Sequence, residues 1–198
     1  MNGKTNVTRR RFLSGGVAVA GVGLVAGLTR WIPVATAGTA PAQPGGRVTI
    51  VVFDDQGRRL GKRTVEPIIK TPAEWQAELT PAQYHILREQ GTESPFSGKY
   101  VNKPERPGIY RCRGCDNALF DSATQFHSGT GWPSFYQPIA IENVTEHSDH
   151  SFGMTRTEIA CTRCGGHLGH KFHDGPPPTG LRYCMDSLAL RLVSIDKA

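Results

Sequence analysis

Four of the five cysteines occur as two Cys-x-x-Cys pairs, Cys112/Cys115 and Cys161/Cys164, with 45 residues between them. Each pair places two sulfurs on one tight turn, and two such turns facing each other complete the tetrahedral thiolate site that zinc favours. Because all four positions would be filled by cysteine, no position is left open for a substrate. The spacing therefore predicts one structural Zn²⁺ per chain. Two disulfides and a redox metal are the alternatives.

Cys184 is the remaining cysteine. A free cysteine is often a small buried hydrophobe, but its context here favours a reactive thiol. The segment RYCMD leads into leucines at 188, 190 and 192, an alternation that predicts a strand with Cys184 and Asp186 on one face. Arg182 and protonated imidazoles nearby would lower the thiol pKa from its ordinary value of about 8.5. Cys184 is thus the candidate nucleophile.

His167 and His170 follow the second cysteine pair in the segment GGHLGH. The metal already has its four ligands, so these imidazoles are free for acid–base work. We predict that they donate a proton to a substrate oxygen. The other histidines are weaker candidates: His173 and, weaker still, His85, His127, His147 and His150.

Trp132 lies in the loop SGTGWPSFY, residues 128–136, whose glycines and proline expose the indole. The indole is either a plug of the core or the wall of a small apolar pocket. The sequence leaves both open.

Two short helices should carry the chain towards this region. Thr71-Pro72-Ala73-Glu74 and Thr80-Pro81-Ala82-Gln83 both have the pattern of a capping box with proline at the first helical position, and Gly91 should end the second helix. Their expected core residues are Trp75, Leu79, Tyr84, Ile86 and Leu87. Ahead of the helices, 47–53 and 58–65 predict a β-hairpin that carries no candidate catalytic group.

Beyond Gly91, glycine and proline separate short segments with β character, which are 108–112, 139–141 and 154–161. No helical period of useful length returns. We therefore predict a mainly β (α+β) fold, in which residues 95–195 form a small antiparallel β domain pinned by the four-cysteine zinc site, with two short N-terminal helices.

The positive charge of the chain is concentrated at its start. The formal net charge is +6, yet residues 1–37 hold five basic residues and no acidic one. The rest is close to neutral, which argues against a nucleic-acid-binding surface. We expect no nucleic-acid partner and a monomer.

The segment TRRRFL, residues 8–13, resembles a twin-arginine export signal. An uncharged run of 16 residues with five glycines follows, and Ala35-Thr36-Ala37 offers a cleavage site before Gly38. The run is short for a membrane span of roughly 20 residues, although an uncleaved anchor is the alternative. The resemblance implies passage through the twin-arginine machinery and a periplasmic location. Such export carries folded proteins, so the metal can be bound before the thiols meet an oxidising compartment. We divide the chain into a signal peptide (1–37), a linker and hairpin (38–70) and a catalytic domain (71–198).

From about residue 71 to 193 the chain resembles the methionine-R-sulfoxide reductase (MsrB) family. The resemblance rests on LTPAQYHILREQGTESPFSG, YRCRGCDNALFDSATQFHSGTGWPSFYQPI, CTRCGGHLGHKFHDGP and GLRYCMDSLALRL, which agree in order and spacing.

The resemblance implies that the Cys184 thiolate attacks the sulfur of methionine-R-sulfoxide and becomes a sulfenic acid. It also implies that His167 and His170 bind and protonate the sulfoxide oxygen, and that Trp132 encloses the substrate methyl group, with Asp186 and Arg182 beside the substrate. The implied partners are oxidised proteins and a thioredoxin-like or other thiol reductant.

Two residues depart from the family pattern. The family often has a resolving cysteine where this chain has Thr130, so we predict direct reduction of the sulfenic acid by an external thiol. The family usually has asparagine where this chain has Asp186. An ionised Asp186 would raise the Cys184 pKa, whereas a protonated one could act as a donor.

Two other classes stay open from the residues alone. A zinc-ribbon binding module would explain the four paired cysteines but would leave Cys184 and the histidines without a role. A thiol peroxidase or disulfide oxidoreductase would use a reactive cysteine, but the latter needs a second free thiol. One fast-reacting thiol in the zinc-loaded protein would favour an enzyme over the module.

Overall fold

The computed structural model describes residues 46–195, and of Phe152 only the backbone. The predicted signal peptide lies outside these residues. Within 46–195, no helix is both long enough and apolar enough to span a bilayer.

Both predicted helices are present, and both begin with the predicted capping boxes. They are α1 (Pro72–Glu78), capped by Thr71, and α2 (Pro81–Glu89), capped by Thr80. In each box the threonine side chain accepts from the third helical N–H while the Glu or Gln side chain returns to the cap N–H. α2 ends directly before Gly91, as predicted, and the left-handed residue is its C-cap Gln90 (φ 55°). A Cβ at Gly91 would lie 2.3 Å from the exposed His85 ring, so that ring would have to move.

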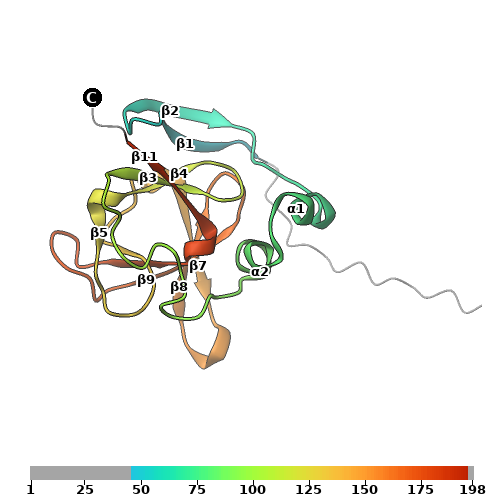
Figure 1. Ribbon diagram of the computed structural model, residues 1–198. Helices are drawn as coiled ribbons and strands as arrows, with labels where there is room; N and C mark the ends of the chain where they lie inside the picture. The colour runs from blue at the N-terminus through green and yellow to red at the C-terminus, as the bar shows by residue number, and fades with distance from the viewer. Residues whose placement is uncertain (1–45, 196–198) are drawn as a thin grey trace, which may run out of the picture. The chain divides into compact units, whose positions relative to one another are not determined.

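Eleven strands form three antiparallel sheets in the described part of the chain (Figure 1). The two-stranded sheet is β1 (Val48–Phe53) and β2 (Arg59–Val65), and the three-stranded sheet has the order β11 (Leu190–Ser194), β3 (Gly108–Cys112), β4 (Ala118–Asp121). The six-stranded sheet has the order β5 (Gln125–Phe126), β6 (Ser134–Phe135), β10 (Arg182–Met185), β9 (His167–Phe172), β8 (Arg156–Cys161), β7 (Val144–Asp149). Short 3₁₀ turns η1 (Ser122–Thr124), η2 (Ile141–Asn143), η3 (Ser151–Gly153) and η4 (Ser187–Ala189) join them. The predicted mainly β fold is confirmed.

The main core lies between the six-stranded sheet, the three-stranded sheet and the two helices. Trp75, Leu79, Ile86 and Leu87 are the buried helix contributions, as predicted, and Tyr84 packs partly buried against them. The sheets contribute fully buried aromatic and aliphatic side chains, among them Tyr110, Phe120, Phe135, Ile159, Leu168, Tyr183 and Met185. The Phe120 and Phe135 rings stack with centroids 4.4 Å apart. The packed core thus supports one face of the six-stranded sheet and fixes the positions of the residues on its other face.

The hairpin is part of the packed structure. Val51 and Phe53 of β1 are buried against Ile109 and Ala118 of the three-stranded sheet. The fully buried Asn143 side chain accepts from the Val51 N–H and donates to the Val51 and Ala118 carbonyls. These bonds satisfy the outer edge of β1 without a further strand.

Two strand predictions were wrong. The segment 139–141 is not a strand, since Ile141 opens the 3₁₀ turn η2. The alternating segment around Cys184 is not one strand either, because β10 ends at Met185, η4 follows, and β11 begins at Leu190 in a different sheet. Asp186 is the N-cap of η4, so strand alternation cannot place it beside Cys184.

Candidate active site

The four paired cysteines converge. Their sulfurs all lie within 4.8 Å of one another, with Cys112 to Cys164 at 3.7 Å and Cys115 to Cys161 at 3.5 Å. Each pair lies on a turn that follows the end of a strand. In these turns the Asp116 N–H donates to the Cys112 carbonyl and the Gly165 N–H donates to the Cys161 carbonyl. No disulfide links any of the five cysteines.

The dimensions of this cluster fit Zn²⁺. Tetrahedral ligands at the usual Zn–S distance of about 2.3 Å are separated by about 3.8 Å, close to the Cys112–Cys164 and Cys115–Cys161 distances. Three of the cysteines are buried and Cys115 is partly buried. The set of four thiols and its size match one structural zinc ion, as predicted. The ion would tie β3, from the three-stranded sheet, to β8, from the six-stranded sheet.

Cys184 lies apart from this cluster, on β10. Strand pairing places it opposite His170 of β9 and opposite Ser134 of β6. Its side chain is half-buried. Neighbours across both ladders point to the same face of the sheet, so the thiol, an imidazole and a hydroxyl share one face.

The pKa of Cys184 is raised in the folded protein. Burial is the largest cause, and the charge of Asp186 adds to it. The Arg182 guanidinium and hydrogen bonds from Thr130 and Ser134 act in the opposite direction. Arg182 therefore favours the thiolate and Asp186 opposes it, both as predicted, but burial outweighs Arg182, so the net shift of the thiol pKa is upward.

Thr130 contacts the thiol from the 128–136 loop. Its hydroxyl lies 3.9 Å from Cys184 Sγ and 2.9 Å from the Ser128 hydroxyl. Gly129 and Gly131 both have positive φ, and a Cβ at Gly131 would lie 2.7 Å from the Phe96 nitrogen. The glycines thus allow the turns of the loop, and Gly131 lets it pack closely against Pro95 and Phe96.

His167 and His170 are brought to one face by a β-bulge. Ile159 and Ala160 of β8 pair with Gly169 and His167, which leaves Leu168 as the extra residue of β9. The bulge shifts the alternation by one, so the two rings lie edge to face with centroids 5.3 Å apart. Gly169 lies where β9 approaches β10 most closely, since a Cβ there would be 2.1 Å from the Cys184 carbonyl oxygen.

Each histidine is held by a carboxylate that the sequence patterns did not single out. His167 Nδ1 lies 2.7 Å from Glu158, and His170 Nε2 lies 2.8 Å from Asp149. The pKa of Glu158 is lowered, mainly by its hydrogen bond with His167. Burial lowers the His170 pKa more than Asp149 raises it, so the His170 ring favours its neutral form.

Asp186 is buried beside His167. Its Oδ1 accepts from the Glu93 N–H at 2.9 Å, and its Oδ2 lies 4.0 Å from His167 Nε2. That Nε2 is itself buried, with no hydrogen-bond partner within 46–195. Burial raises the pKa of Asp186 to about 6, and the Glu93 charge contributes in the same direction.

Arg182 and Trp132 complete the predicted set. Arg182 is 8% exposed, forms a two-pronged ion pair with Asp174 at 2.9 Å, and lies over the Phe172 ring. Trp132 is half-buried and donates from Nε1 to the Glu93 carbonyl at 3.1 Å. The indole is not part of the core cluster.

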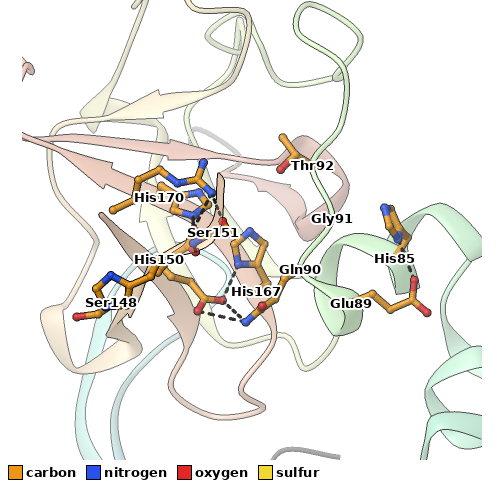
Figure 2. A pocket seen from close by; sticks show the side chains of 13 residues that line it. His85, Glu89, Gln90, Gly91, Thr92, Ser148, His150, Ser151, His167 and His170 are labelled. Atoms are coloured by element: carbon orange, nitrogen blue, oxygen red, sulfur yellow. Dashed lines mark hydrogen bonds and ion pairs between the residues drawn. The ribbon is translucent and has the colours of Figure 1, made fainter. Parts of the chain in front are cut away.

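A cavity of about 570 Å³ reaches both histidines from the side of α2 and the β7–β8 hairpin (Figure 2). Gln90, Gly91 and Thr92 line it on one side, and Ser148, His150 and Ser151 line it on the other. Figure 2 shows the rings of His167 and His170 next to each other in this cavity. Cys184 is not among its lining residues.

The fold and the site define a small antiparallel β protein that is pinned by a four-cysteine metal site and presents one separate thiol beside two carboxylate-bound histidines. Proteins with this arrangement can use the thiol as a nucleophile and the histidines as proton donors to the substrate.

Comparison with known proteins specifies this class further. The SelR domain family matches residues 79–194. The chain is 58% identical over 123 residues to the peptide methionine sulfoxide reductase MsrB of Agrobacterium fabrum, covering 62% of this chain and 90% of that protein. It is 54% identical to the Bradyrhizobium diazoefficiens protein of the same name, over 66% of this chain and 94% of the relative. A Methanosarcina mazei relative with that name is 55% identical, over 62% and 87%. The chain belongs to the SelR (MsrB) family.

Proposed function

We propose that this protein is a peptide-methionine (R)-S-oxide reductase with Cys184 as its nucleophile. The observation that carries the proposal is the placement of one half-buried thiol directly across the ladder from His170, with His167 on the same face and all other cysteines gathered in the metal cluster. Family membership and the names of the relatives support the reaction.

The reaction moves one oxygen atom from the substrate to the enzyme. The Cys184 thiolate attacks the sulfoxide sulfur and forms a bond to it while the sulfoxide oxygen takes up one proton from the site. The oxygen then passes to Cys184 Sγ as the bonds from the substrate sulfur to oxygen and to Sγ break, so methionine leaves and Cys184 keeps the oxygen as a sulfenic acid. Sulfoxide and thiol thus become thioether and sulfenic acid, a balanced exchange.

His167 and Asp186 are placed to hold the sulfoxide oxygen. An oxygen atom can be within hydrogen-bond distance of both His167 Nε2 and Asp186 Oδ2, because two contacts of about 2.8 Å span their separation of 4.0 Å. Glu158 at Nδ1 stabilises the imidazolium that donates from Nε2. Asp186 can donate only while it is protonated. Trp132 would enclose the substrate methyl group.

Cys112, Cys115, Cys161 and Cys164 would hold Zn²⁺, which would cross-link the two sheets. Because cysteine would fill all four coordination positions, the ion would take no part in substrate binding.

The sulfenic acid is reduced by a thiol from outside the chain. A cysteine at position 130 could lie near Cys184, but the residue there is threonine and the other four cysteines form the metal cluster. A thioredoxin-like or other thiol would attack the sulfenic sulfur, release water and form a mixed disulfide, which a second thiol resolves. We propose that the protein is a monomer and binds no nucleic acid.

We further propose that the protein is exported by the twin-arginine machinery, is cleaved near Ala37–Gly38 and repairs oxidised proteins in the periplasm. The support is the arginine cluster and the small-residue run of residues 8–37.

Trapping of the intermediate tests the proposal. One turnover of the reduced protein with a methionine sulfoxide peptide, without added reductant, should yield one equivalent of methionine and a dimedone adduct on Cys184. An adduct or a disulfide that involves a cysteine of the metal cluster would contradict it.

A further inference from the structure

Glu93 is a buried carboxylate that is not among the predicted site residues, although it lies within the segment LTPAQYHILREQGTESPFSG. It lies in the loop that follows α2 and is 8% exposed. Within residues 46–195 it forms no ion pair. A buried carboxylate without a cation must be held by hydrogen bonds, and its bonds lead to the active site.

The backbone of Glu93 holds two of the proposed substrate-contacting residues. Its N–H donates to Asp186 Oδ1 at 2.9 Å, and its carbonyl accepts from Trp132 Nε1 at 3.1 Å. A shift of this single residue would therefore move the carboxyl and the indole together.

The Glu93 side chain holds the turn that follows Cys184. Its Oε1 accepts from the Ser187 N–H at 2.6 Å, and its Oε2 accepts from the Leu188 N–H at 3.1 Å. Gly98 packs closely against it, because a Cβ at Gly98 would lie 2.4 Å from Oε1. The carboxylate is thus held in position by two amides of η4.

We propose that Glu93 is a positioning residue of the active site, which fixes the Trp132 indole and the Asp186 carboxyl relative to the end of the Cys184 strand. Glu93 does not contact the Cys184 thiol. Its predicted effect on turnover rests on the proposed reductase function, whereas its effect on the positions of Trp132 and Asp186 does not depend on which substrate binds.

Glu93 also acts on Asp186 through its charge. The groups that act on the Asp186 carboxyl are Glu93 from the loop and His167 from β9, and Cys184 lies on the preceding strand. The Glu93 carboxylate raises the Asp186 pKa, whereas its N–H lowers it. Glu93→Gln removes the first effect and keeps the second, so it should lower the pKa of Asp186.

The test compares Glu93→Gln with Glu78→Gln, which removes an exposed carboxylate on α1 paired with Lys70. Both zinc-loaded variants are assayed for kcat/KM, for the unfolding midpoint and for the rate of Cys184 alkylation from pH 4.5 to 9. Ionisation of Asp186 repels the thiolate, so the alkylation profile should show an inflection at the Asp186 pKa. We expect Glu93→Gln to move this inflection to lower pH and to reduce kcat/KM about tenfold, as for one lost hydrogen bond to a charged group. Glu78→Gln should leave both unchanged.

A Glu93→Gln protein with the wild-type inflection and wild-type kcat/KM would overturn the proposal. So would a change in the unfolding midpoint alone, since that is the effect of a merely structural residue. Glu93→Ala, which leaves two amides without acceptors, should lower kcat/KM further, by about 10²-fold. If the wild type reduces no sulfoxide, the proposed function fails, while the alkylation profile still decides the role of Glu93.

Discussion

Asp186 and His167 face each other across a gap of 4.0 Å between two side chains that are each 3% exposed. The Glu93 N–H is on the other Asp186 oxygen, and Glu158 is on the other imidazole nitrogen. His167 Nε2 is buried without a hydrogen-bond partner within 46–195, which is costly in the resting protein. The gap has the dimensions to receive one polar atom of a substrate.

Asp186 should make stability depend on pH. Its folded-state pKa of about 6 is above its ordinary value of 3.8, so the folded state binds the proton more tightly than the unfolded state does. Its contribution to stability is therefore greatest at low pH and is lost as the pH rises through about 6. We expect Asp186→Asn to gain about 1 kcal/mol on the wild type between pH 5 and pH 7, measured by denaturant unfolding with zinc in excess. Parallel stability curves for the two proteins would contradict this.

The same substitution should shift the pH–rate profile to lower pH. The Asp186 charge raises the Cys184 pKa, and asparagine removes this repulsion while it keeps a donor in place. We expect kcat/KM at pH 7 to rise and the alkylation profile of Cys184 to shift in the same direction. An unmoved profile would mean that Asp186 is not coupled to the thiol.

Glu158 should be needed to make His167 a proton donor. Its carboxylate accepts from Nδ1 at 2.7 Å and is itself held by the Gln90 side chain. We expect Glu158→Gln to lower kcat/KM by about 10²-fold, the usual contribution of a positioned acid. The control is Glu146→Gln on the adjacent β7, which removes a carboxylate that pairs with Lys171 at the surface. Equal activity of the two variants would show that Glu158 is not needed for proton donation by His167.

Loss of one metal ligand should unfold or strongly destabilise the protein. Cys112→Ser leaves three thiolates, so zinc affinity and the folding free energy that depends on it should both fall. Zinc content by atomic absorption and thermal unfolding by circular dichroism measure this. Cys184→Ser should keep full zinc content and a wild-type unfolding midpoint. A zinc-free Cys112→Ser protein with unchanged stability would contradict a structural role for the metal.

The features that could be predicted from the sequence were those with local signals. The cysteine turns, the capping boxes at Thr71 and Thr80, and strand 108–112 each depend on residues a few positions apart. The features that escaped depend on contacts between distant segments. Glu93 lies 93 residues from Asp186 along the chain, and Asp149 lies 21 residues from His170. The bulge at Leu168 is a register shift between two strands, which periodicity within one strand does not show.

The net upward shift of the Cys184 pKa could not be predicted from the sequence, for a related reason. Neighbouring charges such as Arg182 can be read along the chain, whereas burial depends on how β6, β9 and β10 pack together. The break between Met185 and Leu190 was missed because leucines at alternating positions suit a strand, although Ser187 and Leu188 instead give their N–H groups to Glu93.

The central claim is that Cys184 reduces methionine-R-sulfoxide. Its most direct test is the reduction of separated R and S epimers of a dabsylated methionine sulfoxide with dithiothreitol, by wild type and by Cys184→Ser, both with zinc bound. We expect turnover of the R epimer only, and its complete loss in Cys184→Ser. Turnover of the S epimer, persistent activity in Cys184→Ser, or no turnover by the zinc-loaded wild type would contradict the claim.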